Sequence, residues 1–250
     1  MRHIPQFEAN VVRHCNNRCV ACSHASPFQP LGYEMSAATL ERDLKAMARV
    51  VHADKFKLLG GEPLLHSDLL GLLKVAKASG VADVVNVTTN GKLLSRQPDA
   101  FWKAIDNLYL SVYPNLDPEV EPMARRKCAE HGVTIDVMVT NSFFLQFKRV
   151  PDDGRNSFAC CNWRHHCWMV HEGKLYLCPQ AAFFTDRFMG LPQDFDGLSL
   201  DGITDESLAA YVGRTEPFAA CRVCRSTSHQ TPWAQAASEA EWIEASTHKT

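Results

Sequence analysis

The sequence predicts an α/β fold in which parallel strands form a partial, open TIM-like (β/α)6 barrel, followed by a small cysteine-rich C-terminal part. Three observations favour this fold. Strand-like and helix-like segments alternate over the first 150 residues, which is typical of parallel strands joined by helices. Only five or six such units fit, too few for a closed eight-stranded barrel. Cysteines then crowd residues 160–224, where helical periodicity fades.

The alternating segments have recognisable ends. Strand patterns lie at 8–14, 55–59, 83–89, 108–112 and 133–139, and residues 143–147 have the pattern of a sixth strand. Helix patterns lie between them at 36–51, 68–78, 98–105 and 118–130. Ser36 is a suitable N-cap for the first helix, and Gly80 is placed to end the second. The C-terminal part adds a short strand at 174–177 and a helical tail from Pro232.

Three short loops follow strands that are distant in the sequence. They are residues 15–22 with three cysteines, the run Gly-Gly-Glu-Pro at 60–63, and Thr-Asn-Gly at 89–91. The carboxyl ends of parallel strands meet at one rim, where loops build binding and catalytic sites. We therefore expect these loops to converge on one site.

Cys15, Cys19 and Cys22 form a C-x3-C-x2-C run on one loop. Three thiolates can bind three irons of a [4Fe–4S] cluster, whereas most such clusters have four cysteine ligands. The fourth iron then has no protein ligand and can bind a small molecule. A zinc knuckle completed by His24 is the alternative, because C-x2-C runs also bind zinc. That alternative leaves the Gly-Gly-Glu-Pro run unexplained.

The cysteine run after a first strand and Leu-Gly-Gly-Glu-Pro after a second resemble the radical S-adenosylmethionine (SAM, AdoMet) superfamily, over roughly residues 8–140. The resemblance implies that Cys15, Cys19 and Cys22 hold a [4Fe–4S] cluster whose open iron binds SAM. It also implies SAM contacts at the strand ends, from Gly60, Gly61, Glu62, Pro63, Thr89, Asn90, Gly91 and Ser111, with Tyr113 nearby. One departure is Ala21, at a position that is usually aromatic in the family. Phe28 is a candidate to cover the adenine instead.

A second cysteine group comprises Cys160, Cys161, Cys167, Gly173-x4-Cys178 and Cys221-x2-Cys224. It resembles the SPASM-like auxiliary-cluster domains of radical SAM enzymes, in the shortened "twitch" form with one auxiliary [4Fe–4S] cluster. The resemblance implies Cys178, Cys221 and Cys224 as ligands. The fourth ligand stays open among Cys160, Cys161 and Cys167, of which Cys161 and Cys167 have the better spacing. Zinc is again the alternative, since four thiolates also suit a tetrahedral ion.

The composition indicates an ordinary globular protein. Of 250 residues, 46% are hydrophobic and 22% are charged, and the net charge is −2 without a basic run. Nucleic acid is therefore not expected as a partner. An apolar signal region and a membrane-length stretch are both missing, so we expect a cytoplasmic protein without a membrane partner. We place a domain boundary near residue 150, with the barrel in 1–150 and the auxiliary-cluster domain and C-terminal helix in 151–250.

The resemblance implies an enzyme that cleaves SAM with one electron, giving methionine and a 5′-deoxyadenosyl radical that removes hydrogen from a substrate. Size and cysteine layout resemble a short aminocyclitol dehydrogenase. The expected reaction is therefore oxidation of an alcohol carbon on a small, sugar-like or cyclitol natural-product intermediate, with a flavodoxin- or ferredoxin-type protein as reductant. The base that takes the hydroxyl proton is not identified; candidates near the boundary are Arg149, Arg155, Arg164, His165 and His166.

Two other functions fit the same residues. The first is radical SAM modification or epimerisation of a peptide, for which Cys128, Cys160 and Cys167 are candidate hydrogen donors. Few residues precede the first strand, so the peptide-recognition domain common in such enzymes is not expected. The second is a zinc-stabilised binding module without catalysis. Iron and sulfide analysis after anaerobic purification separates this module from the enzymes.

Overall fold

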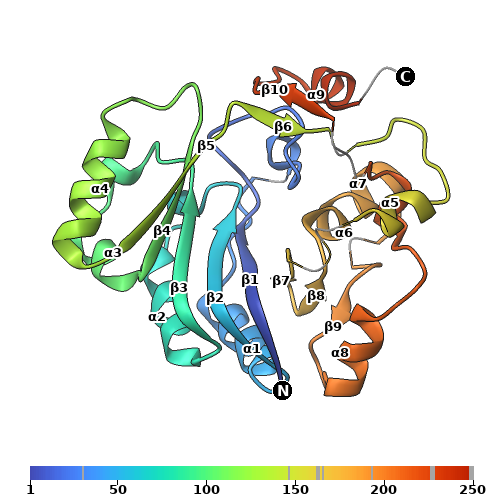
Figure 1. Cartoon of the computed structure of the whole chain (residues 1–250), viewed down its shortest axis with the longest axis horizontal. Helices are drawn as coiled ribbons and strands as arrows, with labels where there is room; N and C mark the ends of the chain where they lie inside the picture. The colour runs from blue at the N-terminus through green and yellow to red at the C-terminus, as the bar shows by residue number, and fades with distance from the viewer. Residues whose placement is uncertain are drawn as a thin grey trace.

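The computed structural model describes the chain except residues 30, 146, 162, 163, 165, 193, 226–228 and 248–250, and except the side chains of 186 and 187. Its centre is an eight-stranded sheet with the order β5-β4-β3-β2-β1-β7-β8-β9 (Figure 1). Neighbours from β5 to β7 pair in parallel. The predicted α/β class with a mostly parallel sheet is confirmed.

The first half of the chain supplies the predicted alternation. Its strands are β1 (Arg2–Val12), β2 (Val51–Gly60), β3 (Ala82–Thr89), β4 (Asn107–Val112) and β5 (Thr134–Val139). Its helices are α1 (Ala37–Met47), α2 (Leu69–Ser79), α3 (Asp99–Ala104) and α4 (Val120–His131). The Ser36 hydroxyl caps α1 by accepting a hydrogen bond from the Thr39 amide at 3.1 Å, and Gly80 ends α2 at a φ of 62°. Both predicted helix ends are confirmed.

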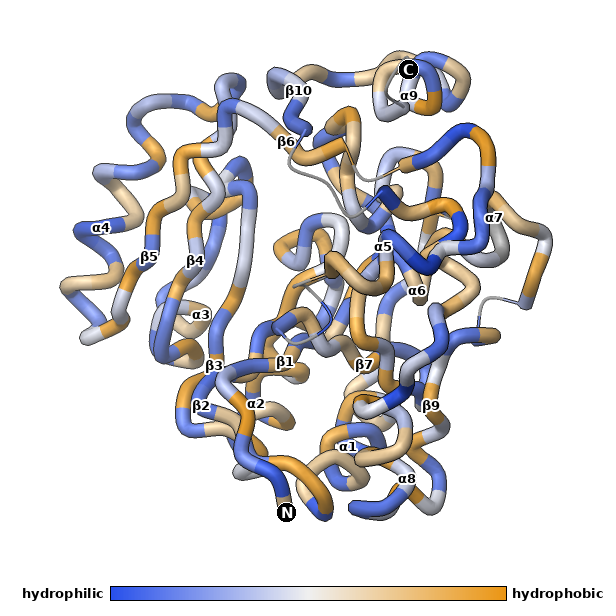
Figure 2. Tube along the Cα trace, turned by 45° about the vertical axis from the view of Figure 1, so that its right-hand side comes forward, coloured by the Kyte–Doolittle hydropathy of each residue, from blue (hydrophilic) through white to orange (hydrophobic). Residues whose placement is uncertain are grey.

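The two faces of this sheet differ in polarity, because neighbouring residues of a strand point to opposite faces. On one face Phe7 of β1 and Phe56 of β2 pack together in the core that the helices cover. Figure 2 shows the resulting alternation of hydrophobic and hydrophilic residues along strands such as β4 and β5. The other face carries a row of register partners, which we call the polar row: Glu8, Lys57, Asn86, Asn107 and Thr134.

The sheet continues beyond residue 150. β7 (Met169–His171) lies parallel to β1, and β8 (Lys174–Tyr176) and β9 (Leu198–Ser199) extend it in antiparallel order. The helices of this half are α5 (Arg155–Ala159), α6 (Pro179–Phe183), α7 (Thr185–Met189) and α8 (Asp205–Val212), with the 3-10 turn η5 (Ala219–Arg222). Both halves therefore share one sheet, and the boundary near residue 150 stays a prediction.

The segment expected as a sixth parallel strand does not join this sheet. β6 (Ser142–Phe144) pairs antiparallel with β10 (Gln230–Pro232), and α9 (Glu239–Ser246) follows. These elements lie above the carboxyl ends of the parallel strands (Figure 1). The sixth parallel strand is β7, at the opposite edge beside β1. The tail differs as well, because Pro232 ends β10 and α9 begins only after its cap, Ser238.

None of the helices described here is long and apolar enough to cross a membrane.

Candidate active site

The loop after β1 places its three cysteines at the rim of the sheet. Cys15, Cys19 and Cys22 line a cavity of about 190 Å³. The same lining contains predicted site residues from the ends of β2, β3 and β4, namely Gly60, Gly61, Thr89, Asn90 and Ser111, with Tyr113. The expected convergence of the loops on one site is therefore present. Glu62, Pro63 and Gly91 are not part of this lining, and the SAM contacts of all these residues stay predictions.

The two glycines at the end of β2 are required by the cysteine loop itself. A Cβ on Gly60 would lie 2.2 Å from the Val12 carbonyl oxygen, and a Cβ on Gly61 would lie 2.0 Å from the His14 carbonyl oxygen. The Gly61 amide donates to the Val12 carbonyl at 2.9 Å, and the Glu62 amide donates to the His14 carbonyl at 3.0 Å. The Gly-Gly run therefore sets the position of the chain that leads into Cys15.

Glu62 joins the loops after β2 and β3. Its carboxylate is buried and accepts hydrogen bonds from the Thr89 hydroxyl at 2.6 Å and from the amides of Asn90 and Leu64 at 2.8 and 3.1 Å. Burial raises the pKa of Glu62 to about 7, although these three donors oppose the rise. Asn90 then donates to Asn16 at 2.7 Å, and its amide nitrogen lies 3.7 Å from the Cys15 sulfur. The three loops thus form one bonded unit.

The cavity residues fit a metal-bound polar ligand. Three buried polar atoms of its lining have no hydrogen-bond partner in the described part of the chain: Asn17 Nδ2, His24 Nε2 and Ser26 Oγ. Buried polar groups are rarely left unsatisfied, so these atoms indicate a missing partner. Burial raises the pKa of the Cys19 thiol to about 12, and it raises that of Cys15 as well. A bound metal cation stabilises thiolates and would therefore allow these thiols to ionise.

The aromatic cover of the cavity differs from the expectation. Tyr113 and Phe143 both line it, and their rings stack with centroids 6.0 Å apart. Phe28, expected over the adenine, instead packs edge-on against Trp242 at 5.8 Å and is not part of the lining. Ala21 has a left-handed φ of 60°, which is uncommon for an alanine. Phe143 was missed by the sequence because its loop could not be positioned.

The C-terminal tail holds the cysteine loop from the other side. The Trp233 indole donates to the Cys19 sulfur at 3.2 Å, and the Trp242 indole donates to the Cys19 carbonyl at 2.9 Å. The Ala21 amide donates to the Ser246 hydroxyl at 2.8 Å. The tail was expected only as a helix from Pro232, and its contacts with this loop were not predicted from the sequence.

Four cysteines of the second group lie together around α6 and η5. Burial raises the pKa values of Cys178, Cys221 and Cys224, and the charges of nearby groups, with Cys161 among them in all three cases, raise these values further. Cys178 is the N-cap of α6, and Cys161 follows α5. Of the three candidates for a fourth member, the structure therefore brings Cys161 to this group.

The other two candidates lie elsewhere. Cys160 is exposed, and its thiol donates to Asn156 at 3.7 Å. Cys167 lines a second cavity of about 260 Å³, together with Glu8 of β1. Burial raises the pKa of Cys167 to about 12, and Glu8 and Lys57 affect it more than Cys161 does.

Among the residues that the structure describes, no three His, Cys, Asp or Glu side chains converge closely enough to hold one metal ion. A single zinc ion needs all its ligands at about 2.0–2.3 Å. In an iron–sulfur cluster each thiolate binds its own iron, so the sulfurs stay apart.

Of the basic residues suggested as proton acceptors, the four that the structure describes, Arg149, Arg155, Arg164 and His166, line neither cavity. Arg155 pairs with Glu216 at 3.5 Å, and the Arg164 guanidinium lies 4.1 Å from the centroid of the Phe158 ring. His166 is exposed, and His165 lies outside the described residues.

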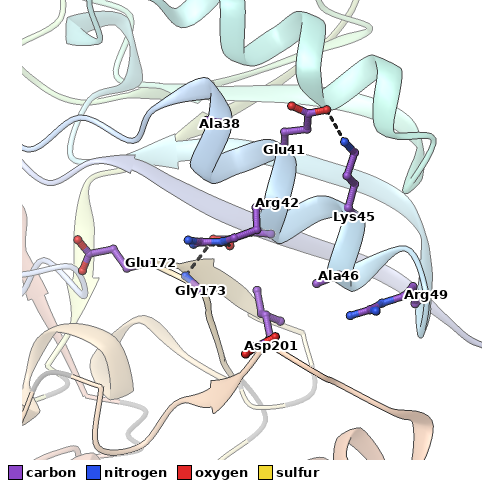
Figure 3. Close-up of a pocket in the computed structure, with 11 residues that line it drawn as sticks. Ala38, Glu41, Arg42, Lys45, Ala46, Arg49, Glu172, Gly173 and Asp201 are labelled. Carbon is purple, nitrogen blue, oxygen red and sulfur yellow. Dashed lines mark hydrogen bonds and ion pairs between the residues drawn. The ribbon is translucent and has the colours of Figure 1, made fainter.

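A third cavity, of about 700 Å³, lies beside α1 and contains no cysteine (Figure 3). Several of its charged side chains are paired. Glu41 pairs with Lys45 at 2.6 Å, and the buried Asp43 accepts hydrogen bonds from Arg42 at 2.7 Å and from the Gly173 amide at 3.0 Å. Gly173, at a φ of 77°, thus has a structural role in the turn between β7 and β8.

Comparisons with known proteins agree with this site. The family model "Radical SAM superfamily" matches residues 9–141. The chain is 36% identical over 113 residues to a GTP 3′,8-cyclase of Chlorobaculum tepidum, and the match covers 44% of this chain and 33% of that protein. The chain thus spans about a third of the length of this relative.

Two solved structures resemble the fold. One is BtrN in complex with AdoMet and 2-DOIA, with a TM-score of 0.54, 13% identity, and coverage of 84% of this chain and 82% of that chain. The other is native anSMEcpe with bound AdoMet, with a TM-score of 0.56, 13% identity, and coverage of 96% and 94%. At these identities the likeness concerns the fold alone.

Proposed function

Because the chain belongs to the radical SAM superfamily, we propose that it cleaves SAM reductively and uses the 5′-deoxyadenosyl radical to remove a hydrogen atom from a small substrate. A [4Fe–4S] cluster with SAM, bound at Cys15, Cys19 and Cys22, would supply this radical. The observation that carries the proposal is the cavity in which these thiols meet the loops after β2, β3 and β4.

The chain's own residues would bind and orient the cofactor. The backbone at Gly60 and Gly61 faces the cavity beside the thiols and offers acceptors for a SAM ammonium. Asn17, His24 and Ser26 would use their free polar atoms on the ligand. Tyr113 and Phe143 offer a ring surface that excludes water from the adenine.

We further propose that Cys161, Cys178, Cys221 and Cys224 hold one auxiliary [4Fe–4S] cluster, so that the C-terminal half is a twitch-type domain. Pro179 and Gln180, directly after Cys178, line the second cavity. A substrate in this second cavity would lie beside the four cysteines. An electron can then pass from the substrate to the auxiliary cluster. This arrangement supports oxidation of an alcohol carbon on a sugar-like or cyclitol substrate by a cytoplasmic enzyme, with electrons from a flavodoxin- or ferredoxin-type partner.

The test is 5′-deoxyadenosine release from SAM by the anaerobically reconstituted protein with dithionite. We expect release by the natural chain and by Cys128→Ala, because Cys128 is buried in the core away from the site. Cys19→Ala should reduce release to the background of protein-free buffer. Release at the normal rate from Cys19→Ala would contradict the proposal.

Cys167 favours a second candidate, radical epimerisation, because its thiol lines the second cavity and could return a hydrogen atom to the substrate. Reactions in D₂O distinguish the two. Epimerisation adds one solvent deuterium to the substrate carbon and depends on Cys167, whereas oxidation yields a carbonyl and tolerates Cys167→Ala.

A further inference from the structure

We propose that Glu8 forms the polar end of the substrate site, where it binds a hydroxyl or ammonium group of a small, non-phosphorylated substrate and accepts the hydroxyl proton. This inference rests on the proposed function and names its proton acceptor and substrate class. Glu8 was not among the residues expected from the sequence.

Glu8 lies where a substrate of the radical would have to bind. It lines the second cavity, and this cavity shares Ser23, His24, Leu59 and Phe143 with the cavity of the three thiols. The two cavities therefore adjoin each other. A molecule beside Glu8 would be a neighbour of SAM in the first cavity.

Glu8 is the member of the polar row that lines the second cavity and is left for a ligand there. Asn86 donates to Asn107 at 2.5 Å, and Asn107 donates to Thr134 at 2.8 Å, so these side chains satisfy one another. Glu8 is only 8% exposed, and its carboxylate has no hydrogen bond or ion pair with any described residue. Lys57, its register partner, influences it electrostatically without forming an ion pair.

The surroundings of Glu8 suit a proton acceptor at neutral pH. Burial raises the pKa of Glu8 to about 7, and the attraction of Lys57 limits the rise. Burial likewise lowers the pKa of Lys57, which also faces Lys55 and Asp136. From the β7 side the neighbouring titratable group is Cys167. Efficient general bases have pKa values near the working pH.

The lining also selects against highly charged anions. Neither cavity has a lysine or arginine among its described lining residues. Buried phosphate groups need charge-assisted donors, which arginine and lysine usually supply. Lys92 is not among the lining residues, and its ammonium donates to the Asn17 side-chain oxygen at 2.6 Å. A triphosphate beside Glu8 would be unpaired and repelled, so the substrate class differs from the GTP in the names of the curated relatives.

The reaction at Glu8 balances as a two-electron oxidation. The hydrogen atom on the carbinol carbon passes to the 5′-deoxyadenosyl radical and gives 5′-deoxyadenosine. The hydroxyl proton passes to a Glu8 carboxylate oxygen, and the electron pair of the O–H bond stays on the substrate oxygen. The remaining unpaired electron must leave to a one-electron acceptor of the iron–sulfur class as the carbonyl forms.

The experiment compares three probes with the reconstituted full chain, SAM and dithionite: glucosamine, glucosamine 6-phosphate and GTP. Two products are measured, 5′-deoxyadenosine and a carbonyl trapped with hydroxylamine. We expect glucosamine to raise 5′-deoxyadenosine release above the rate without a probe and to yield the carbonyl, whereas GTP does neither. The phosphate group of the second probe should weaken the stimulation.

Glu8→Gln keeps the shape of the side chain but cannot accept the proton. It should lower carbonyl formation from glucosamine about 100-fold. Glu8→Asp should restore part of the carbonyl formation, and Asp136→Asn, outside both cavities, is the control. A normal iron content and unfolding curve establish that Glu8→Gln folds.

The outcomes separate the two proposals. Failure of the natural chain to release any 5′-deoxyadenosine overturns the proposed function, and with it this inference. If release occurs but GTP stimulates it, if no probe stimulates it, or if Glu8→Gln forms the carbonyl at the normal rate, the role of Glu8 is overturned alone.

Discussion

Replacing Gly61 with alanine tests whether the loop after β2 sets the position of the cysteine loop. The new Cβ would lie 2.0 Å from the His14 carbonyl oxygen and 2.3 Å from its carbon, against 3.4–4 Å for an ordinary contact. The two backbones must therefore separate by about 1.4 Å, the difference between 3.4 and 2.0 Å. Because His14 precedes Cys15, this separation moves the first thiol of the site.

The expected magnitude follows from the contacts that would be lost. The separation weakens two backbone hydrogen bonds, from the amides of Gly61 and Glu62, each worth about 1 kcal/mol. Residual crowding adds about 1–3 kcal/mol. We expect the free energy of unfolding to fall by about 3–5 kcal/mol, and 5′-deoxyadenosine release to fall about 100-fold because the reacting groups are misplaced.

Gly80→Ala is the matched control. Gly80 ends α2 at a φ of 62°, and a Cβ there would meet nothing within 4 Å. This variant should lose about 1–2 kcal/mol from left-handed strain alone and keep its iron content and activity. Urea unfolding and anaerobic activity of the two variants provide the comparison. A Gly61→Ala protein as stable and as active as Gly80→Ala would refute the reasoning.

The remaining predictions concern the second cysteine group, a buried carboxylate and the tail. Cys161→Ala should lower the reconstituted iron content by about four atoms per chain, whereas Cys167→Ala should leave it unchanged; the reverse would return Cys167 to the ligand set. Burial raises the pKa of Glu62 from 4.5 to about 7, so the folded protein favours the protonated carboxyl. This contribution to the free energy of unfolding is complete below pH 4.5 and is lost as the pH rises through 7. Glu62→Gln should remove about 3 kcal/mol of the decrease in unfolding free energy between low and high pH, as measured by urea unfolding. An unaltered decrease would contradict a buried Glu62 that is neutral at low pH. Trp242→Ala should cost about 3–5 kcal/mol in unfolding free energy and expose Cys19 to thiol reagents, and unchanged labelling would argue against its contact with the loop.

The sequence predicted the first half of the fold well because strong local signals agree there with the final packing. Ser36 and Gly80 end helices where expected, and each strand from β2 to β5 was found within a few residues. β1 begins at Arg2 rather than at residue 8, because Pro5 interrupts the strand pattern and is skipped in the register with β2. β6 was misplaced because its partner β10 lies far along the chain.

The site was predictable where residues follow strands in a known motif, and not where packing decides. In a sequence, a buried acidic residue of a strand cannot be distinguished from one that faces solvent. Glu8 was therefore recognised as a site residue only when its register partners were known. Spacing could not choose between Cys161 and Cys167, six residues apart on one loop. Only the folded chain separates them, one beside Cys178 and the other beside Glu8.

The tail shows why the first cysteine group depends on the whole chain. Trp233 and Trp242 donate to two atoms of Cys19, and the Ser246 hydroxyl accepts from the amide of Ala21, which has an unfavourable left-handed φ. Strain of this kind persists only where surrounding contacts maintain it. The loop conformation that presents the thiols is thus imposed by residues more than 200 positions later. Cluster assembly at Cys15, Cys19 and Cys22 should therefore require that the tail has already folded onto the barrel.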